Sequence, residues 1–174
     1  KVVVDPAVMG GLLARIGETS SESLRSISDI VWAIDPKNDD GEALVKRVQR
    51  IANELLERKG IAVSFSVSGG VQDLKLPMNA RKELVLLVKE AVHNASKYSG
   101  ASTVQVSLHR RNASLAASVM DDGMGFDPAL HPDGHGLGSM HRRAQALGGT
   151  LSLRSAPGHG TFVGVEVDLT RIRD

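Results

Sequence analysis

An amphipathic stretch that ends in EAVHNASKYSG, residues 90–100, constrains the fold of this chain more than any other segment. Apolar residues recur there at spacings of three and four, the period of a helix with one face against a core. The apolar positions are Leu84, Leu87, Val88, Ala91 and Ala95. The spacing predicts a helix over about residues 79–98 that packs along one side of a larger core.

Three polar side chains follow one flank of that helix. At about 100° per residue, Glu90, Asn94 and Lys97 form a row beside the apolar face, whereas His93 points away from that face. A solvated flank with one i, i+4 pair explains such a row as well as a functional site does. The segment by itself leaves both interpretations open, and it predicts a surface position for His93.

Composition narrows the function classes. The 174 residues suffice for one good core, and the 21 basic and 20 acidic residues nearly balance, so nucleic-acid binding is not expected. The absence of cysteine excludes disulfides and a thiolate nucleophile. The N-terminus as given lacks the pattern of a signal peptide, and no apolar run approaches the roughly 20 residues of a membrane span. The chain starts at Lys1 rather than Met, so we expect a fragment of a longer protein. We expect this fragment to be cytoplasmic and to make no membrane contact of its own. The full-length protein is expected to be cytoplasmic or membrane-anchored.

The first part of the chain predicts two helices and a strand. Residues 6–34 predict a long helix with a narrow apolar seam, which suits a partner helix as well as packing on its own domain. A polar break at residues 36–42 separates it from an amphipathic helix over residues 44–56, and residues 61–67 alternate as a strand does. The seam consists of Leu13, Ile16, Leu24, Ile27, Val31 and Ile34.

The second part completes an α+β fold. A hairpin around Arg111 and Asn112 and two C-terminal strands give a sheet of about five strands. Residues 122–140 hold many glycines and prolines and predict a long functional loop before a short helix at residues 140–149. The sum is a two-layer α/β sandwich: a mixed, mostly antiparallel sheet with about three helices on one face, preceded by a long helix.

Three glycine-rich motifs suit a ligand. DDGMGFD, residues 121–127, places Asp121 at a strand end, where it can accept a hydrogen bond from a ligand amine, although Asp-Gly pairs are also typical of plain turns. GHGLGSM, residues 134–140, runs into a helix, and backbone amides at a helix N-terminus can cradle phosphate. GHGT, residues 158–161, ends in a hydroxyl at the start of a strand. None of these is a P-loop or a dinucleotide-binding motif.

In order and spacing, these motifs resemble the ATP-binding catalytic domain of two-component sensor histidine kinases, in the GHKL or Bergerat superfamily shared with gyrase, Hsp90 and MutL. The resemblance runs from about Ala43 to Leu169. ELVLLVKEAVHNASKYSGA resembles the N box, DDGMGFD and GHGLGSMHRRAQALGG resemble the two glycine boxes, and GHGTFVGVEV resembles the closing strand. The resemblance implies a Bergerat fold and a protein-histidine kinase that uses ATP and Mg²⁺.

The resemblance also implies roles for single residues. Asn94 would coordinate Mg²⁺, Lys97 would neutralise phosphate charge, and Asp121 would read the adenine amino group. Glu90 matches the general base of related ATPases, and Thr161 would support the adenine site. Gly136 and Gly138 would hold the phosphates under a lid of residues 127–139. The other implied nucleotide contacts are Tyr98, Gly123, Gly125, Phe126, Gly134, Leu137, Ser139 and Met140.

RSISDIVWAIDPKNDD, residues 25–40, resembles the second dimerisation helix of kinases related to nitrate and desaturase sensors. This implies that residues 1–38 are a remnant of the dimerisation and phosphoacceptor domain and residues 39–174 the catalytic domain. A homodimer in the full-length protein and a response regulator as partner are implied as well. None of the six histidines follows the acceptor pattern, so the acceptor is expected outside this chain. The alternatives are an ATP-binding regulatory switch module and an anti-sigma-type serine kinase.

Overall fold

The computed structural model describes residues 9–12, 17, 27–130 and 135–172. Within these ranges, residues 27–34 are helical and precede the main body of the fold. The longer helices that follow are α2 (Gly41–Leu56), α3 (Met78–Tyr98) and α4 (His135–Ala146). The strands are β1 (Ala62–Ser68), β2 (Thr103–Arg111), β3 (Ser114–Asp121), β4 (Thr150–Ser155) and β5 (Thr161–Asp168). Short 3-10 helices are η1 (Pro36–Asn38), η2 (Glu57–Lys59), η3 (Val71–Asp73) and η4 (Pro128–Leu130).

The strands form a mixed sheet in the order β1-β2-β3-β5-β4. β1 and β2 pair in parallel, and the other neighbouring strands pair antiparallel. A parallel pair needs a long crossover, and α3 lies in the segment that joins β1 to β2. The hairpin between β2 and β3 turns at Asn112, whose φ of 53° is the left-handed conformation that asparagine tolerates.

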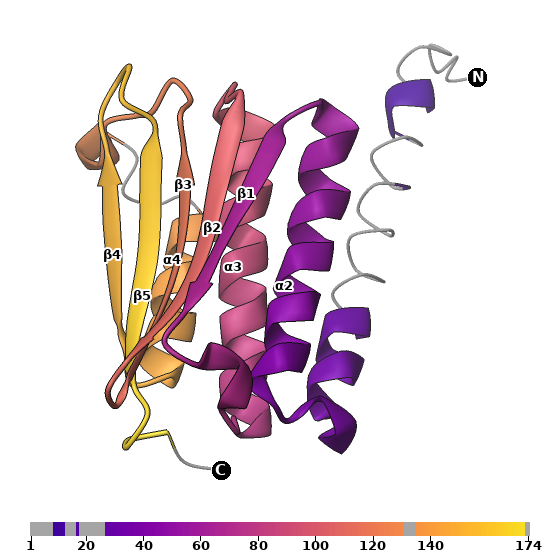
Figure 1. The fold of residues 1–174 in the computed structure, drawn as a ribbon. Helices are drawn as coiled ribbons and strands as arrows, with labels where there is room; N and C mark the ends of the chain where they lie inside the picture. Colours follow the sequence, from indigo (N-terminus) through magenta and orange to yellow (C-terminus); the bar gives the residue numbers. More distant parts are fainter. Residues whose placement is uncertain (1–8, 13–16, 18–26, 131–134, 173–174) are drawn as a thin grey trace.

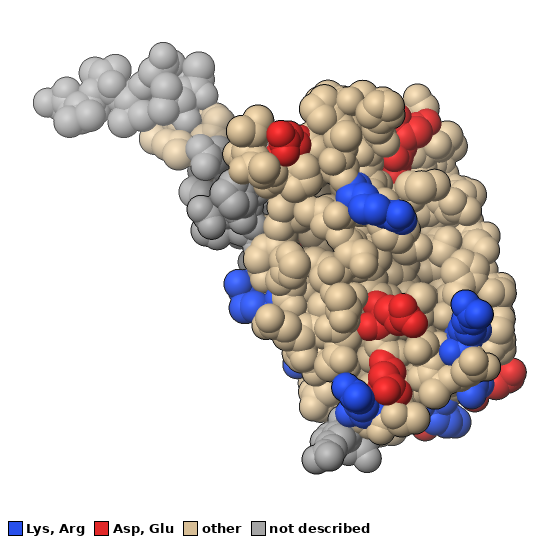
Figure 2. Space-filling view, turned by 90° about the vertical axis from the view of Figure 1, so that its left-hand side faces the viewer, with Lys and Arg blue, Asp and Glu red and all other residues tan. Residues whose placement is uncertain are grey.

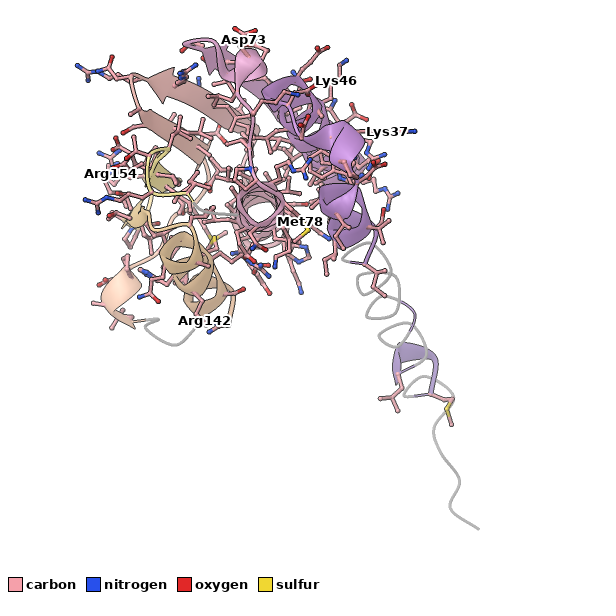
Figure 3. The ribbon with its side chains drawn as sticks, turned by 90° about the horizontal axis from the view of Figure 1, so that it is seen from below. Lys37, Lys46, Asp73, Met78, Arg142 and Arg154 are labelled. Carbon is pink, nitrogen blue, oxygen red and sulfur yellow. The ribbon has the colours of Figure 1, made fainter. Side chains whose placement is uncertain are left out.

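The three helices cover one face of this sheet (Figure 1), and the view from below shows the same two layers (Figure 3). The core lies between them, where the apolar faces of α2 and α3 meet alternate residues of the central strands. Fully or almost fully buried members include Leu44, Leu84, Leu115, Val104 and Val165. The predicted α+β two-layer sandwich, with a helix before it, is therefore confirmed.

The end of α3 fixes the loop that follows β3. The Ser99 hydroxyl donates to the Ala95 carbonyl at 2.6 Å, and the Ser99 carbonyl accepts from the Met124 amide at 2.8 Å. Gly123 packs so closely here that a Cβ atom on it would stand 2.3 Å from the Ser99 oxygen. The polar row of α3 and the first glycine motif are thereby held side by side.

Helix α4 begins earlier than the sequence predicted. We expected residues 122–140 to be loop, yet the helix starts at His135 and includes Gly136 and Gly138. Glycine disfavours helix by roughly 1 kcal/mol relative to alanine. Tertiary packing of α4 against α3 outweighs that preference, and a Cβ atom on Gly136 would crowd the side chains of Glu90 and Asn94 on α3.

The helix predicted for residues 6–34 is described only in part. Residues 9–12 and 27–34 are helical, whereas Leu13, Ile16 and Leu24 of the predicted seam lie outside the described residues. The other seam residues, Ile27, Val31 and Ile34, are 56%, 61% and 53% exposed. In the described part, the seam therefore faces away from the chain's own core.

The surface carries both signs of charge. On the face drawn in Figure 2, lysine and arginine are interspersed with aspartate and glutamate. Among the residues that the structure describes, no helix combines the length and apolarity that crossing a membrane requires.

Candidate functional site

A cavity of about 750 Å³ opens where α3 and α4 meet the adjacent ends of β3 and β5. Its volume lies within the roughly 300–1,000 Å³ of small-molecule sites. Many of the residues that the resemblance singled out line it: Glu90, Asn94, Tyr98, Asp121, Gly125, Phe126, Gly136, Leu137, Met140 and Thr161. Segments from four parts of the sequence thus converge on one site.

Helix α3 supplies a polar wall at one end of the cavity. Glu90 and Asn94 are half-buried on it, and the first turn of α4 lies against both. A Cβ atom on Gly136 would stand 2.4 Å from Oε1 of Glu90 and 3.2 Å from Nδ2 of Asn94. Because the partial positive charge of a helix N-terminus favours anions, this end of the cavity suits a phosphate group.

Asp121, at the end of β3, places a carboxylate in the cavity lining, whereas the first turn of α4 offers a partial positive charge instead. Its side chain is buried, and burial raises the pKa of the carboxyl above its usual value, while hydrogen bonds from the backbone amides of Gly123 and Thr161 oppose that rise. The Gly123 amide donates to Oδ1 at 2.9 Å. A buried carboxylate with acceptor capacity to spare is suited to receive a hydrogen bond from a ligand amine.

The neighbouring carboxylate of Asp122 serves the fold instead. It accepts from the amides of Ser102 and Thr103 and from the Thr103 hydroxyl, at 2.8 to 2.9 Å. The hydrogen bonds from Thr103 and Ser102 lower the pKa of the Asp122 carboxyl. The two consecutive aspartates therefore differ: one faces the cavity, and the other ties two loops together.

The cavity's apolar part comes from the loop after β3 and from the strands. Met124, Phe126 and Leu153 line it, together with Leu137 of α4. Gly125 has a φ of 58°, and a Cβ atom on it would stand 2.1 Å from the Ala156 oxygen. Only glycine fits there, and the loop can therefore press against the turn between β4 and β5. A flat, largely apolar group with an amine at its edge matches this part of the cavity.

Ser155 supports the same region, and sequence reasoning missed it. Its hydroxyl accepts from the Phe126 amide at 2.9 Å, lies 3.0 Å from the Gly160 carbonyl, and bonds to the Thr161 hydroxyl at 2.9 Å. The serine ends β4 without any motif around it, so only the pairing of β4 with β5 reveals its position.

Four of the expected contact residues lie outside the cavity lining: Lys97, Gly123, Gly138 and Ser139. Lys97 is exposed, and its Nζ lies 5.2 Å from the centre of the Tyr98 ring. Gly123 acts through its hydrogen bond to Asp121 and its packing on Ser99. Gly134 and part of the expected lid, residues 131–134, lie outside the described residues.

The surface position predicted for His93 is wrong. The side chain is half-buried and lines the cavity, as does Lys89, which the sequence analysis did not consider. The helical period turns His93 away from the apolar face, yet only about 60° around the helix separates His93 from Glu90, which also lines the cavity. The cavity wall is wide enough to include both flanks of the polar row.

The donor set also suits a hard cation that a ligand helps to bind. Glu90 and Asn94 offer carboxylate and amide oxygens, the ligand types that Mg²⁺ prefers. Among the described residues, no group of three or more histidine, cysteine or acidic side chains is placed to hold a metal ion without help. An ion here would complete its shell with water and phosphate oxygens.

Comparison with known families agrees with this geometry. Residues 79–171, just over half of the chain, match the family described as histidine kinase-, DNA gyrase B- and HSP90-like ATPase. The chain belongs to this ATPase family. The matched range runs from the first turn of α3 to just beyond β5, so it includes every residue that lines the cavity except Leu55 of α2. The resemblance drawn from the sequence motifs is confirmed.

Two curated relatives of this ATPase domain carry kinase names. Sensor histidine kinase LiaS of Bacillus subtilis is 26% identical over 151 residues, which are 86% of this chain and 41% of the relative. The histidine-protein kinase/phosphatase DegS of Brevibacillus brevis is 28% identical over 149 residues, which are 85% of this chain and 38% of the relative. The chain thus spans about two fifths of the length of these relatives.

Solved structures share the fold. The blue-light activated histidine kinase EL346 of Erythrobacter litoralis superposes with a TM-score of 0.70 at 22% identity. The match covers 90% of this chain and 56% of that protein. At this identity the likeness supports the architecture of the ATPase domain, including the helix that precedes it.

Proposed function

We propose that residues 39–174 form the ATP-binding catalytic domain of a sensor histidine kinase, and that residues 1–38 belong to its dimerisation domain. The observation that carries the proposal is the position of Gly136 against Glu90 and Asn94, opposite the buried Asp121, in one cavity. A nucleotide needs a site for its base amine and a site for its phosphates, and the two ends of this cavity supply them.

The base would occupy the end near Asp121. The buried carboxylate would accept a hydrogen bond from the adenine amino group, while Met124, Phe126 and Leu153 would offer apolar surface to the ring. Thr161 supports this end, because its backbone amide and hydroxyl are fixed by Asp121 and Ser155. Hydrogen bonding to an amine favours adenine over a base with a carbonyl in that place.

The phosphates would occupy the end between α3 and α4. The first turn of α4 would direct the partial positive charge of a helix N-terminus at the anion, and Gly136 would let it approach closely. Asn94, with Glu90 beside it, would hold Mg²⁺. Mg²⁺, when bound, neutralises charge on the phosphate oxygens. Lys97 would add a more distant positive charge at the rim.

In the reaction, the bond between the γ-phosphorus and the bridging oxygen breaks, a bond from phosphorus to a histidine nitrogen forms, and ADP leaves. We place the acceptor histidine outside residues 1–174, on a first dimerisation helix, and a response regulator as the next acceptor. Among the described histidines, His93 lies in α3, His109 in β2 and His141 in α4. All three lie within residues 39–174, the proposed catalytic domain, rather than on a dimerisation helix. The resemblance to related ATPases also implies a general-base role for Glu90.

Calorimetric titration of the chain with ATP tests the proposal. The wild type should bind ATP more tightly with Mg²⁺ than with a chelator, and Asn94→Ala should lose that difference. Asn79→Ala, at an exposed position in the first turn of the same helix, is the matched control and should bind as the wild type does. No binding of ATP by the folded wild type would overturn the function, and Mg²⁺-dependent binding by Asn94→Ala would remove Asn94 from the metal site.

A labelling experiment tests the placement of the acceptor. With ATP labelled at the γ-phosphate, the chain alone should take up no label, and addition of the first dimerisation helix should restore transfer. Strong self-labelling would contradict an acceptor outside the chain. Tight ATP binding without any transfer would favour the regulatory switch module.

A further inference from the structure

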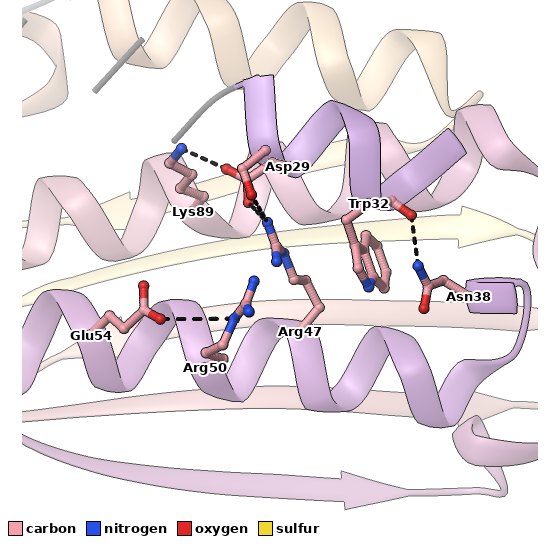
Figure 4. Close-up of polar contacts among 8 residues, drawn as sticks. Asp29, Trp32, Asn38, Arg47, Arg50, Glu54 and Lys89 are labelled. Atoms are coloured by element: carbon pink, nitrogen blue, oxygen red, sulfur yellow. Dashed lines mark hydrogen bonds and ion pairs between the residues drawn. The ribbon is translucent and has the colours of Figure 1, made fainter. Parts of the chain in front are cut away.

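A buried carboxylate joins the N-terminal helical residues 27–34 to the catalytic part of the chain. Asp29 is 3% exposed, and each of its oxygens meets a cation from a different helix (Figure 4). Oδ1 lies 2.5 Å from Nη2 of Arg47 in α2, and Oδ2 lies 2.6 Å from Nζ of Lys89 in α3. Asp29, Arg47 and Lys89 are named the Asp29 clamp below.

The clamp is the polar centre of a wider contact. The Arg47 guanidinium lies 5.5 Å from the centre of the Trp32 ring, and Asn38 donates to the Trp32 carbonyl at 2.9 Å. Arg81 of α3, also buried, donates to the Asp35 carbonyl at 3.3 Å. Side chains of α2, α3 and η1 therefore hold residues 29–35 through charge and hydrogen bonding.

Loss of one member would leave the others in an unfavourable setting. The side chains of Asp29 and Arg47 are 4% and 6% exposed, and that of Lys89 is 18% exposed. Without the carboxylate, two cations would face each other away from water, and without Lys89 the carboxylate would keep one of its two cations. Docking of residues 27–34 thus depends on how fully the clamp is paired.

Lys89 lines two cavities. It lines the large cavity beside Glu90, and it also lines a smaller cavity of about 220 Å³ together with Asp29 and Arg47. Leu55 lines both cavities as well. An ammonium group on a flexible four-carbon stem can turn from one anion to another without movement of the helix that carries it.

We propose that Lys89 couples occupancy of the nucleotide cavity to docking of residues 27–34. A polyphosphate anion in the cavity competes with Asp29 for the Lys89 ammonium, and the clamp loosens as the nucleotide binds. By linkage, a docked helix lowers the affinity for nucleotide by the same factor. The coupling rests on the proposed nucleotide binding. Docking of residues 27–34 then depends on whether nucleotide occupies the cavity.

Trp32 provides an internal probe, because it is the chain's single tryptophan and sits half-buried at the clamp. A non-hydrolysable ATP analogue with Mg²⁺ should shift its emission to longer wavelength, with the same midpoint as calorimetric binding. Lys89→Met should still bind the analogue, at most about tenfold more weakly, a cost of about 1.4 kcal/mol, but should lose the shift. Lys89→Arg keeps the charge and should keep the shift.

Arg50→Met is the matched control. Arg50 lines the smaller cavity and pairs with Glu54 at 3.8 Å, yet this pair is more than half exposed and lies apart from Asp29 (Figure 4). The shift should persist in this variant. Asp29→Asn should show the shifted emission before any ligand is added, together with faster amide exchange over residues 27–34.

The outcomes separate the two proposals. Calorimetric binding by the wild type without any change in Trp32 emission overturns the coupling and leaves ATP binding intact. An undiminished shift in Lys89→Met overturns the role of Lys89. No calorimetric binding by the wild type overturns the proposed function, and the coupling with it.

Discussion

Gly136 lies so close to Glu90 that a Cβ atom on the glycine would stand 2.4 Å from the glutamate Oε1. In Gly136→Ala, either the carboxylate swings aside or the first turn of α4 retreats from α3. The affinity for ATP should fall about tenfold or more, equivalent to about 1.4 kcal/mol, because both changes disturb the phosphate end of the cavity. The unfolding temperature should change little, since the obstructing atom ends a flexible side chain. Titration calorimetry and thermal melts check the two quantities.

Gly138→Ala is the control for this prediction. A Cβ atom on Gly138 would meet Nη1 of Arg142 at 3.5 Å, an ordinary van der Waals contact. This variant should therefore bind ATP nearly as the wild type does. Equal losses in both variants would mean that helix propensity, rather than the contact with Glu90, sets the affinity.

Asp121→Asn should stabilise the fold while it weakens ATP binding. Burial raises the pKa of this carboxyl, so the ionised form is destabilising when the pH lies above that pKa. Removal of the charge should raise the unfolding temperature at pH 7, and the gain should vanish as the pH falls below the ordinary value of 3.8. Thermal melts across this pH range measure the effect.

Asp122→Asn is the matched control with the opposite sign. Hydrogen bonds from Thr103 lower the pKa of Asp122, so its ionised form stabilises the fold above its unfolded pKa, and that contribution is lost as the pH falls through the lowered value. This variant should melt at a lower temperature at pH 7 and bind ATP normally. Destabilisation by both substitutions would contradict the different environments assigned to the two aspartates.

The fold could be predicted from local patterns, because each element carries its own periodicity. The apolar spacing of α3 and the turn at Asn112 are visible in the sequence, and both are found in the structure. The places of His93, Lys89 and Ser155 at the site depend instead on which helices and strands pack together. The helical period of α3 shows which residues share a flank, but only the packing of α4 and of the N-terminal helix against α3 makes that flank a cavity wall. The packing of α4 against α3 also explains why α4 begins at His135 despite its glycines.

Lys97→Met should reduce ATP affinity by less than about threefold, because charges at exposed positions are largely screened by water and salt. Lys97 lies at the cavity's rim beside Tyr98 rather than in its lining. The reduction should shrink further at high salt. Lys46→Met, an exposed lysine of α2, serves as control and should show no reduction. A loss of tenfold or more at high salt would instead show that Lys97 folds inward onto bound phosphate, as the resemblance to sensor kinases implies.

Val31→Glu should convert a dimer of this chain into a monomer. Val31 is 61% exposed and lies between Ile27 and Ile34 on a seam that the described core does not cover, and we propose that a second copy of the same helix covers it. A carboxylate in the middle of that seam would be buried unpaired in the dimer.

Light scattering after size exclusion measures the mass, with Lys37→Glu, at an exposed position beyond the helix, as control. A monomeric wild type, or an unchanged dimer of Val31→Glu, would contradict the prediction. Because Val31 is exposed within its own chain, the substitution should alter monomer stability by no more than about 0.5 kcal/mol. Loss of the dimer with unchanged secondary structure would therefore assign the seam to association rather than to the chain's own core.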